Sequence, residues 1–247
     1  MQRTALFLPF VLLAATPGST LLAQSQFQED VVSTAAGDIT ISFIGHGTLM
    51  FTFGEKVIHI DPVGREADYA TLPDADLILI THEHGDHLDP AAVAEISKDG
   101  TEVVVSGSCE GSLEGARVMR NGDAGTVAGF HVEAVPAYNI VQMRSEGMPY
   151  HPKGDGNGYV ITFGDLRVYV AGDTENIPEM TTLEGIDIAF LPMNLPYTMT
   201  PEMVADAARA FRPRILYPYH FGETDTDELV RLLADEEGIE VRVREMG

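Results

Sequence analysis

Four potential metal ligands lie within six residues of one another, at positions 82–87. His82, His84, Asp86 and His87 follow an apolar run at 76–81, and this window holds three of the chain's eight histidines. In an extended chain alternate side chains face the same side, so His82 and His84 would project together, whereas Asp86 and His87 fall where the chain turns. Imidazole and carboxylate ligands with no nearby cysteine favour zinc, and iron or manganese is also compatible. This spacing indicates a site for two divalent metal ions.

Two further ligands follow strands that are expected later in the chain. The apolar strand expected at 166–170 runs into Gly172 and Asp173, and the strand expected at 214–217 runs toward His220. A strand end, a glycine and then a carboxylate is a common arrangement at metal sites. Glu175 is expected to lie behind the ligands or to face solvent.

These three sequence motifs together resemble those of a known protein family. The run Thr81-His82-Glu83-His84-Gly85-Asp86-His87, together with Gly172-Asp173-Thr174 and Tyr219-His220, resembles the signature of the metallo-β-lactamase-fold hydrolase superfamily. The segments at 136–139, 171–175 and 218–222 look most like the branch that contains ascorbate-6-phosphate lactonase-like and phosphodiesterase-like hydrolases. The resemblance implies a four-layer αββα sandwich of the metallo-β-lactamase type, in which Asp173 bridges the two metals, His220 is the last ligand and Asp61 supports the ligands from behind.

The third histidine of the first metal site is not where similar hydrolases often place it. Asn139, a poor zinc ligand, stands after the strand that would deliver it. We expect His151 to complete the first site with His82 and His84, because a three-histidine set commonly includes a His-x-His pair. His131 is the competitor, but it lies inside an alternating strand and is expected to be buried there for structural reasons. The second metal would then take Asp86, His87 and His220.

The resemblance implies two-metal hydrolysis, in which the cations lower the pKa of a shared water and polarise the bond to be cleaved. Asp86 could also orient that water. His46, in a Gly-His-Gly turn, and Tyr197 are candidates to donate to the developing oxyanion. Arg144 and Lys153 flank His151 and either meet an anionic group of the substrate or are ordinary solvent-facing charges.

The pattern of expected elements is mixed α/β. Alternating residues predict strands at 38–44, 49–53 and 56–60 as an antiparallel meander. Asp89 and Pro90 predict the start of a helix directly after the metal loop. Further strands are expected at 102–105, 125–127, 130–135, 159–163, 187–191 and 240–243, and helices at 200–211 and 226–237.

Composition restricts the location and the partners. An arginine, an apolar run at 5–15 and a small residue at Ala23 are typical of a secretory signal peptide, so we expect residues 1–23 to be removed and 24–247 to form one domain. The mature protein would be periplasmic or extracellular and would not insert stably into a membrane. Its 38 acidic and 15 basic residues give a net charge of −23, which argues against nucleic acid as a partner. Cys109 is the only cysteine, and we expect it to be a buried or half-buried free thiol.

We therefore expect an exported metal-dependent hydrolase that cleaves an ester, lactone or phosphodiester bond in a small molecule, which could be anionic. Two alternatives remain open from sequence. One is a non-catalytic exported metal-binding protein, and the other is an iron-dependent oxidoreductase on the same fold.

Overall fold

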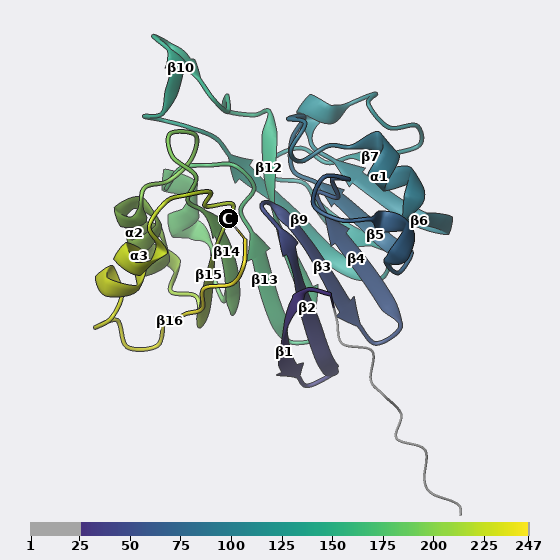
Figure 1. Ribbon diagram of the computed structural model, residues 1–247, viewed down its shortest axis with the longest axis horizontal. Helices are drawn as coiled ribbons and strands as arrows, with labels where there is room; N and C mark the ends of the chain where they lie inside the picture. Colours follow the sequence, from purple (N-terminus) through teal and green to yellow (C-terminus); the bar gives the residue numbers. More distant parts are fainter. Residues whose placement is uncertain (1–25, 247) are drawn as a thin grey trace, which may run out of the picture.

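The computed structural model describes residues 26–246, and within them most strands form two sheets of seven (Figure 1). The first sheet has the order β1 (Gln28–Thr34), β2 (Gly37–Gly45), β3 (Thr48–Phe53), β4 (Lys56–Ile60), β5 (Ala75–Ile80), β6 (Ser97–Val105), β7 (Arg117–Val118). The second has the order β16 (Glu240–Val241), β15 (Ile215–Tyr219), β14 (Ile188–Pro192), β13 (Leu166–Val170), β12 (Gly156–Phe163), β9 (Phe130–Ala137), β8 (Ala124–Val127). A separate hairpin pairs β10 (Met143–Ser145) with β11 (Met148–Pro149).

The two sheets pack face to face through an aromatic core. Alternate residues of β2, β3 and β4 point inward because side chains in a strand alternate between its faces. Phe51 of the first sheet lies 5.7 Å from Phe163 and 5.9 Å from Phe190 of the second, measured between ring centroids. Aromatic rings in tilted or edge contact at these distances stabilise the fold by more than the burial of their apolar area alone.

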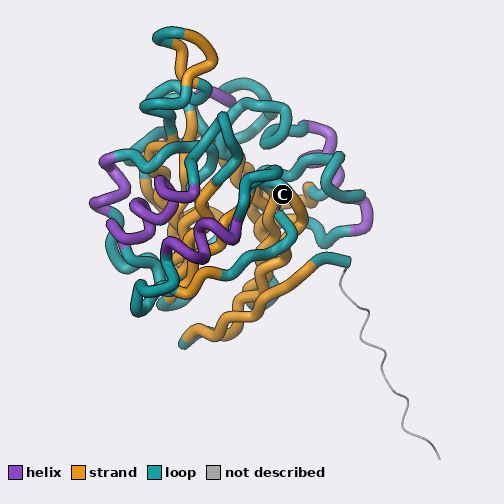
Figure 2. The backbone as a smooth tube through the Cα atoms, turned by 60° about the vertical axis from the view of Figure 1, so that its left-hand side comes forward, coloured by secondary structure: helices purple, strands orange, loops and turns teal. Residues whose placement is uncertain are grey.

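Helices cover the outer faces of the sheets. Helices α2 (Pro201–Phe211) and α3 (Thr226–Leu232) pack on the second sheet, and α1 (Pro90–Glu95) packs on the first. Figure 2 shows the strands inside and the helices outside, and the expected αββα sandwich is confirmed. Short 3₁₀ helices complete the layers: η1 (Tyr69–Thr71), η2 (Gly107–Cys109) and η3 (Pro178–Thr182). No helix in residues 26–246 is long and apolar enough to cross a membrane.

The helix after the metal loop begins as expected. The side chain of Asp89 accepts hydrogen bonds from the backbone N–H groups of Ala91 and Ala92, at 2.9 and 3.4 Å, and Pro90 takes the first helical position. This N-cap turns the chain out of the loop at 82–87 and into α1, which fixes where that loop ends.

Some expectations were wrong in detail. Helix α3 ends at Leu232 rather than at 237, because the acidic segment beyond it turns back to Arg209, whose Nε donates to Glu236 at 2.7 Å. β16 is two residues long rather than four. His131 is exposed, not buried, because its face of β9 is left uncovered, and its nearest charged neighbour is Glu133 at 3.8 Å. Cys109 is a buried free thiol, as expected.

Candidate metal centre

The candidate ligands gather at one edge of the sandwich. In the first sheet β2, β4 and β5 run in the same direction, and in the second β9, β13 and β15 do so. Their carboxyl ends therefore lie at a common edge, the place where α/β folds usually bind ligands. The residues delivered there are His46 after β2, Asp61 after β4, His82 after β5, Asn139 after β9, Asp173 after β13 and His220 after β15.

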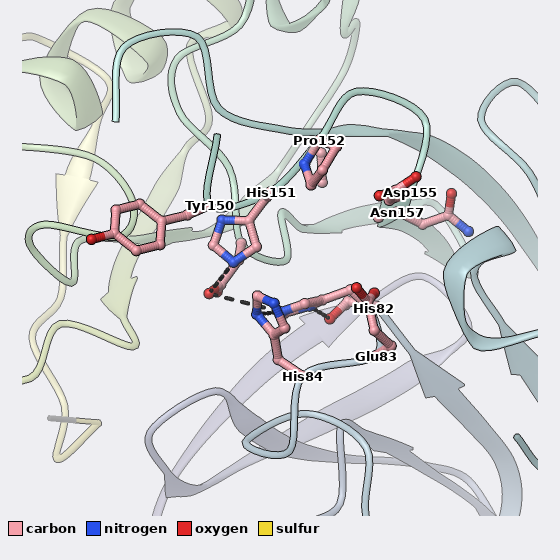
Figure 3. A pocket seen from close by; sticks show the side chains of 12 residues that line it. His82, Glu83, His84, Tyr150, His151, Pro152, Asp155 and Asn157 are labelled. Atoms are coloured by element: carbon pink, nitrogen blue, oxygen red, sulfur yellow. Dashed lines mark hydrogen bonds and ion pairs between the residues drawn. The ribbon is translucent and has the colours of Figure 1, made fainter. Parts of the chain in front are cut away.

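Three histidines form the first cluster, and Figure 3 shows His82, His84 and His151 turned toward one another. His82 Nε2 lies 3.1 Å from His84 Nδ1, and one nitrogen of each ring falls within 4.8 Å of the others. Burial lowers the pKa of His82 well below its ordinary value, so that imidazole is neutral, the form that binds a metal.

Asp173 lies between this cluster and a second one, with one oxygen toward each. Its Oδ2 is 3.2 Å from His151 Nε2 and 4.0 Å from His82 Nε2. Its Oδ1 is 3.5 Å from His87 Nε2 and 3.7 Å from His220 Nε2. Burial alone would raise the pKa of Asp173, but the imidazoles of His220 and His87 outweigh it and hold that pKa well below its ordinary value.

Asp86 belongs to the second cluster. Its Oδ2 lies 3.7 Å from His220 Nε2 and 3.5 Å from His46 Nε2, and each of these residues offers one atom within 4.8 Å of the others. His46 and His220 both have positive φ, at 50° and 47°. Non-glycine residues rarely adopt this backbone conformation, and strained backbone is enriched at functional sites.

The donor set fits metal ions. His87 Nε2, Asp173 Oδ1 and His220 Nε2 are buried and have no hydrogen-bond partner among the described residues. A buried polar atom without a hydrogen-bond partner costs free energy. Three such atoms facing one another are therefore suited to bind a common partner, such as a metal ion. Ligands bound tetrahedrally at near 2.1 Å are about 3.4 Å apart, which matches the separations around Asp173.

Asp61 fixes His87 from behind. Buried Asp61 lies with its Oδ2 2.7 Å from His87 Nδ1, and it accepts hydrogen bonds from Thr81 N and Thr81 Oγ1 at 2.7 and 2.6 Å. A carboxylate on one ring nitrogen selects the tautomer that leaves the other nitrogen free for a metal. The carboxylate thus orients Nε2 of His87 toward Asp173.

Asn139 does the same for His151. Its Oδ1 lies 2.5 Å from His151 Nδ1 and accepts the backbone N–H of His151 at 2.9 Å. The amide in turn donates through Nδ2 to Glu175 at 3.1 Å. The residue that breaks the expected histidine pattern is therefore the one that holds the replacement histidine in place.

The comparisons with known proteins agree with this geometry. A family model described as a beta-lactamase superfamily domain matches residues 40–220. The chain belongs to the β-lactamase superfamily. A UPF0173 metal-dependent hydrolase of Thermus thermophilus is 32% identical over 222 residues, which cover 85% of this chain and 93% of that protein. Another UPF0173 metal-dependent hydrolase, of Thermococcus onnurineus, is 31% identical over 216 residues, which cover 80% of this chain and 93% of that protein.

Solved structures of this superfamily share the fold. A Parabacteroides distasonis protein described as a metal-dependent hydrolase is 51% identical, with a TM-score of 0.85 over 90% of this chain and 100% of that one. Igni18, a metallo hydrolase of Ignicoccus hospitalis, is 24% identical, with a TM-score of 0.67 over 85% of this chain and 96% of that one. At this identity the similarity shows a common fold only. The protein is a metal-dependent hydrolase of the metallo-β-lactamase fold.

A cavity of ≈ 540 Å³ opens beside the clusters of this hydrolase. His84, Asp86, His151, Asp173 and His220 line it on the side of the metal centre. The remaining wall comes from Gly85, Arg144, Tyr150, Asn194 and Tyr197. Its size is in the range of small-molecule sites.

Two residues expected near the substrate lie in different surroundings. Tyr197 is at the cavity, where its ring meets that of Tyr150 at 5.0 Å in an edge contact. Lys153 does not line the cavity, because its Nζ lies 2.6 Å from Glu179 and 3.2 Å from Tyr138 Oη. The Lys153 charge is thus already paired.

The expectations did not include the roles of Thr81, Asn139 and Gly47. Thr81 directly precedes the histidine motif, and Asn139 is itself a poor zinc ligand. A Cβ at Gly47 would lie 2.8 Å from His87 Cε1 and 3.1 Å from His220 Cδ2. The only sequence signal for this close approach is the glycine that follows His46.

Proposed function

We propose that this chain is an exported hydrolase that uses two divalent metal ions, zinc by preference, to cleave an ester, lactone or phosphodiester bond in a small molecule. One observation carries the proposal: the two oxygens of the buried Asp173 carboxylate face two different sets of imidazoles. A carboxylate placed in this way is suited to hold two ions at once.

The residues divide into two sites. His82, His84 and His151 would hold one ion. Asp86, His87 and His220 would hold the other, since His87 and His220 face Asp173 Oδ1 and Asp86 faces His220, and Asp173 would contact both ions. Two such ions, when bound, supply a water of lowered pKa and polarise the bond that is cleaved. Asp61 and Asn139 keep His87 and His151 in the tautomers that present Nε2.

The protein's other groups act on the substrate. Tyr197 lines the cavity, and His46 Nε2 lies 3.5 Å from Asp86 Oδ2 in the second cluster. Both would donate hydrogen bonds to the oxygen on which negative charge develops. The size of the cavity suits a small molecule, and the net charge of −23 disfavours a polyanionic one.

A panel of chromogenic phosphodiesters, lactones and carboxylic esters tests this proposal, with metal content measured on the same sample. We expect turnover of at least one class, loss of turnover on chelation, and recovery when zinc is restored. A protein that binds two metal equivalents but turns over no member of the panel would instead be a metal-binding protein.

Export is part of the proposal, although the expected signal segment at 1–23 lies outside the described residues. The charged start, apolar run and Ala23 support it. Mass spectrometry of the protein from its native host should find a new N-terminus near Gln24, and an intact Met1 on cytoplasmic material would contradict export.

A further inference from the structure

We propose that the substrate carries an oxyanion, a carboxylate or phosphate, set apart from the bond that is cleaved, and that Arg144 binds it. This inference rests on the proposed function, since it concerns the substrate of the same cavity. It assigns a role to the β10–β11 hairpin, which projects from the two sheets in Figure 1.

Arg144 is a cation without a counter-charge in a strongly acidic protein. Fourteen of the chain's 15 Lys and Arg residues lie in residues 26–246, since Arg3 falls outside them. Within that part of the chain, all but Arg117 and Arg144 have a carboxylate oxygen within 4.0 Å. With 38 acidic residues available, a guanidinium left unpaired at a cavity is a binding group for something else.

The position of Arg144 identifies what it faces. Its side chain lines the same cavity as Asp86, Asp173 and His220, and its guanidinium carbon lies 5.8 Å from the centroid of the Tyr150 ring. Stacking on an aromatic face restricts a guanidinium while leaving its N–H groups free. A substrate whose reacting group lies at the metal centre could therefore extend a second group toward Arg144.

The hairpin that carries Arg144 is tied to the metal centre. Buried Glu175, two residues after Asp173, accepts the backbone N–H groups of Ile140, Val141 and Gln142 at 2.8, 2.8 and 2.5 Å. The start of the hairpin is thus fixed relative to the carboxylate between the two clusters. Arg144 consequently lies on a hairpin whose start is held by hydrogen bonds, and not on an unattached loop.

Charge explains why one local cation would matter. A net charge of −23 repels an anionic substrate at long range, and an uncompensated guanidinium at contact distance helps to offset that repulsion at a point away from the metal ligands. Guanidinium binds carboxylate or phosphate through two parallel N–H bonds, so it selects an oxyanion over a neutral polar group.

Two esters that differ in one group test the inference. 4-Nitrophenyl butyrate and mono-4-nitrophenyl succinate share the scissile bond, but one chain ends in methyl and the other in carboxylate. We expect the metal-loaded protein to favour the succinate ester in kcat/KM by about tenfold or more. Arg144→Ala should remove that preference, mainly through KM, and Arg144→Lys should keep part of it.

Arg117→Ala is the matched control, because it deletes the other exposed, unpaired arginine at a position that does not line the cavity. It should leave the preference and the activity unchanged. An equal loss in Arg117→Ala and Arg144→Ala, or an unaltered preference in Arg144→Ala, would overturn the inference.

Calorimetric binding of succinate, butyrate and 3-phosphonopropionate to the metal-loaded protein gives a readout that needs no turnover. We expect the dianions to bind more tightly than butyrate only when Arg144 is present, and the stronger of the two identifies carboxylate or phosphate. Turnover without an anion preference would leave the proposed function standing and remove this inference. Arg144-dependent binding without turnover of any ester would do the reverse.

Discussion

At the scale of single residues, the candidate metal centre is packed so closely at some positions that no larger side chain would fit. Gly47 is an example, because its backbone passes against the rings of His87 and His220. Gly85, within the histidine motif itself, faces open space, with nothing within 4 Å of a Cβ built there. Position in the motif is therefore a poorer guide to tolerance than contact with the ligands.

We expect Gly47→Ala to weaken the proposed second metal site and Gly85→Ala to leave it intact. The added methyl of Gly47→Ala would lie 2.8 Å from His87 Cε1 and must displace that ring. Metal affinity at the second site should fall by about ten- to a hundredfold, the usual cost of disturbing a ligand's support. Competition with a chromogenic chelator measures this for both variants, and equal affinities in the two would contradict it.

At the scale of elements, Glu175 joins the strand-end loop that carries Asp173 to the hairpin that carries Arg144. It is buried, and four N–H groups point at it, three from the backbone and one from Asn139. This segment connects the first histidine cluster, through Asn139 and His151, to the wall of the cavity.

Glu175→Gln should lower the free energy of unfolding by about 2–3 kcal/mol, because the introduced amide turns an N–H toward donors that need an acceptor. The rate of backbone hydrogen exchange at residues 139–151 should increase in the same variant. Glu179→Gln replaces a half-buried carboxylate that pairs with Lys153 and accepts a hydrogen bond from Tyr138 Oη, and it should cost at most about 1 kcal/mol. Equal changes in the two variants, measured by urea unfolding, would show that Glu175 does not anchor the hairpin.

The sequence predicts what is local and leaves open what depends on distant contacts. His82, Asp173 and His220 each follow a strand whose apolar pattern is visible, so their place at a common edge could be expected. The pairing of Asn139 with His151, and of Glu175 with three successive N–H groups, depends on how a long loop folds back. β1 and the β10–β11 hairpin were also not expected, since polar strands at an edge carry little periodic signal.

At the scale of the whole molecule, stability should depend on pH through a buried histidine outside the candidate ligand clusters. His59 of β4 is fully buried, and its Nε2 lies 3.1 Å from the carbonyl oxygen of Pro73. Burial lowers its pKa to about 4, below the ordinary value of 6.5. Between these two pH values the unfolded chain binds a proton that the folded chain does not, so stability falls as the pH falls.

We expect the free energy of unfolding to drop by about 3 kcal/mol more in the wild type than in His59→Gln when the pH goes from 7 to 4. Both proteins should be studied with chelator present, so that metal release does not contribute. The same pH dependence in the two proteins would mean that His59 is protonated within the fold.

Asp173 is proposed to hold two metal ions that act together in hydrolysis, and metal content and rate measured on one sample test this role most directly. The wild type should bind two equivalents, and Asp173→Ala should bind fewer than two and lose activity by more than about a hundredfold. Asp99→Ala, an exposed carboxylate in β6, should change neither quantity. Full hydrolytic activity of Asp173→Ala with one metal ion or none bound would contradict the two-metal account.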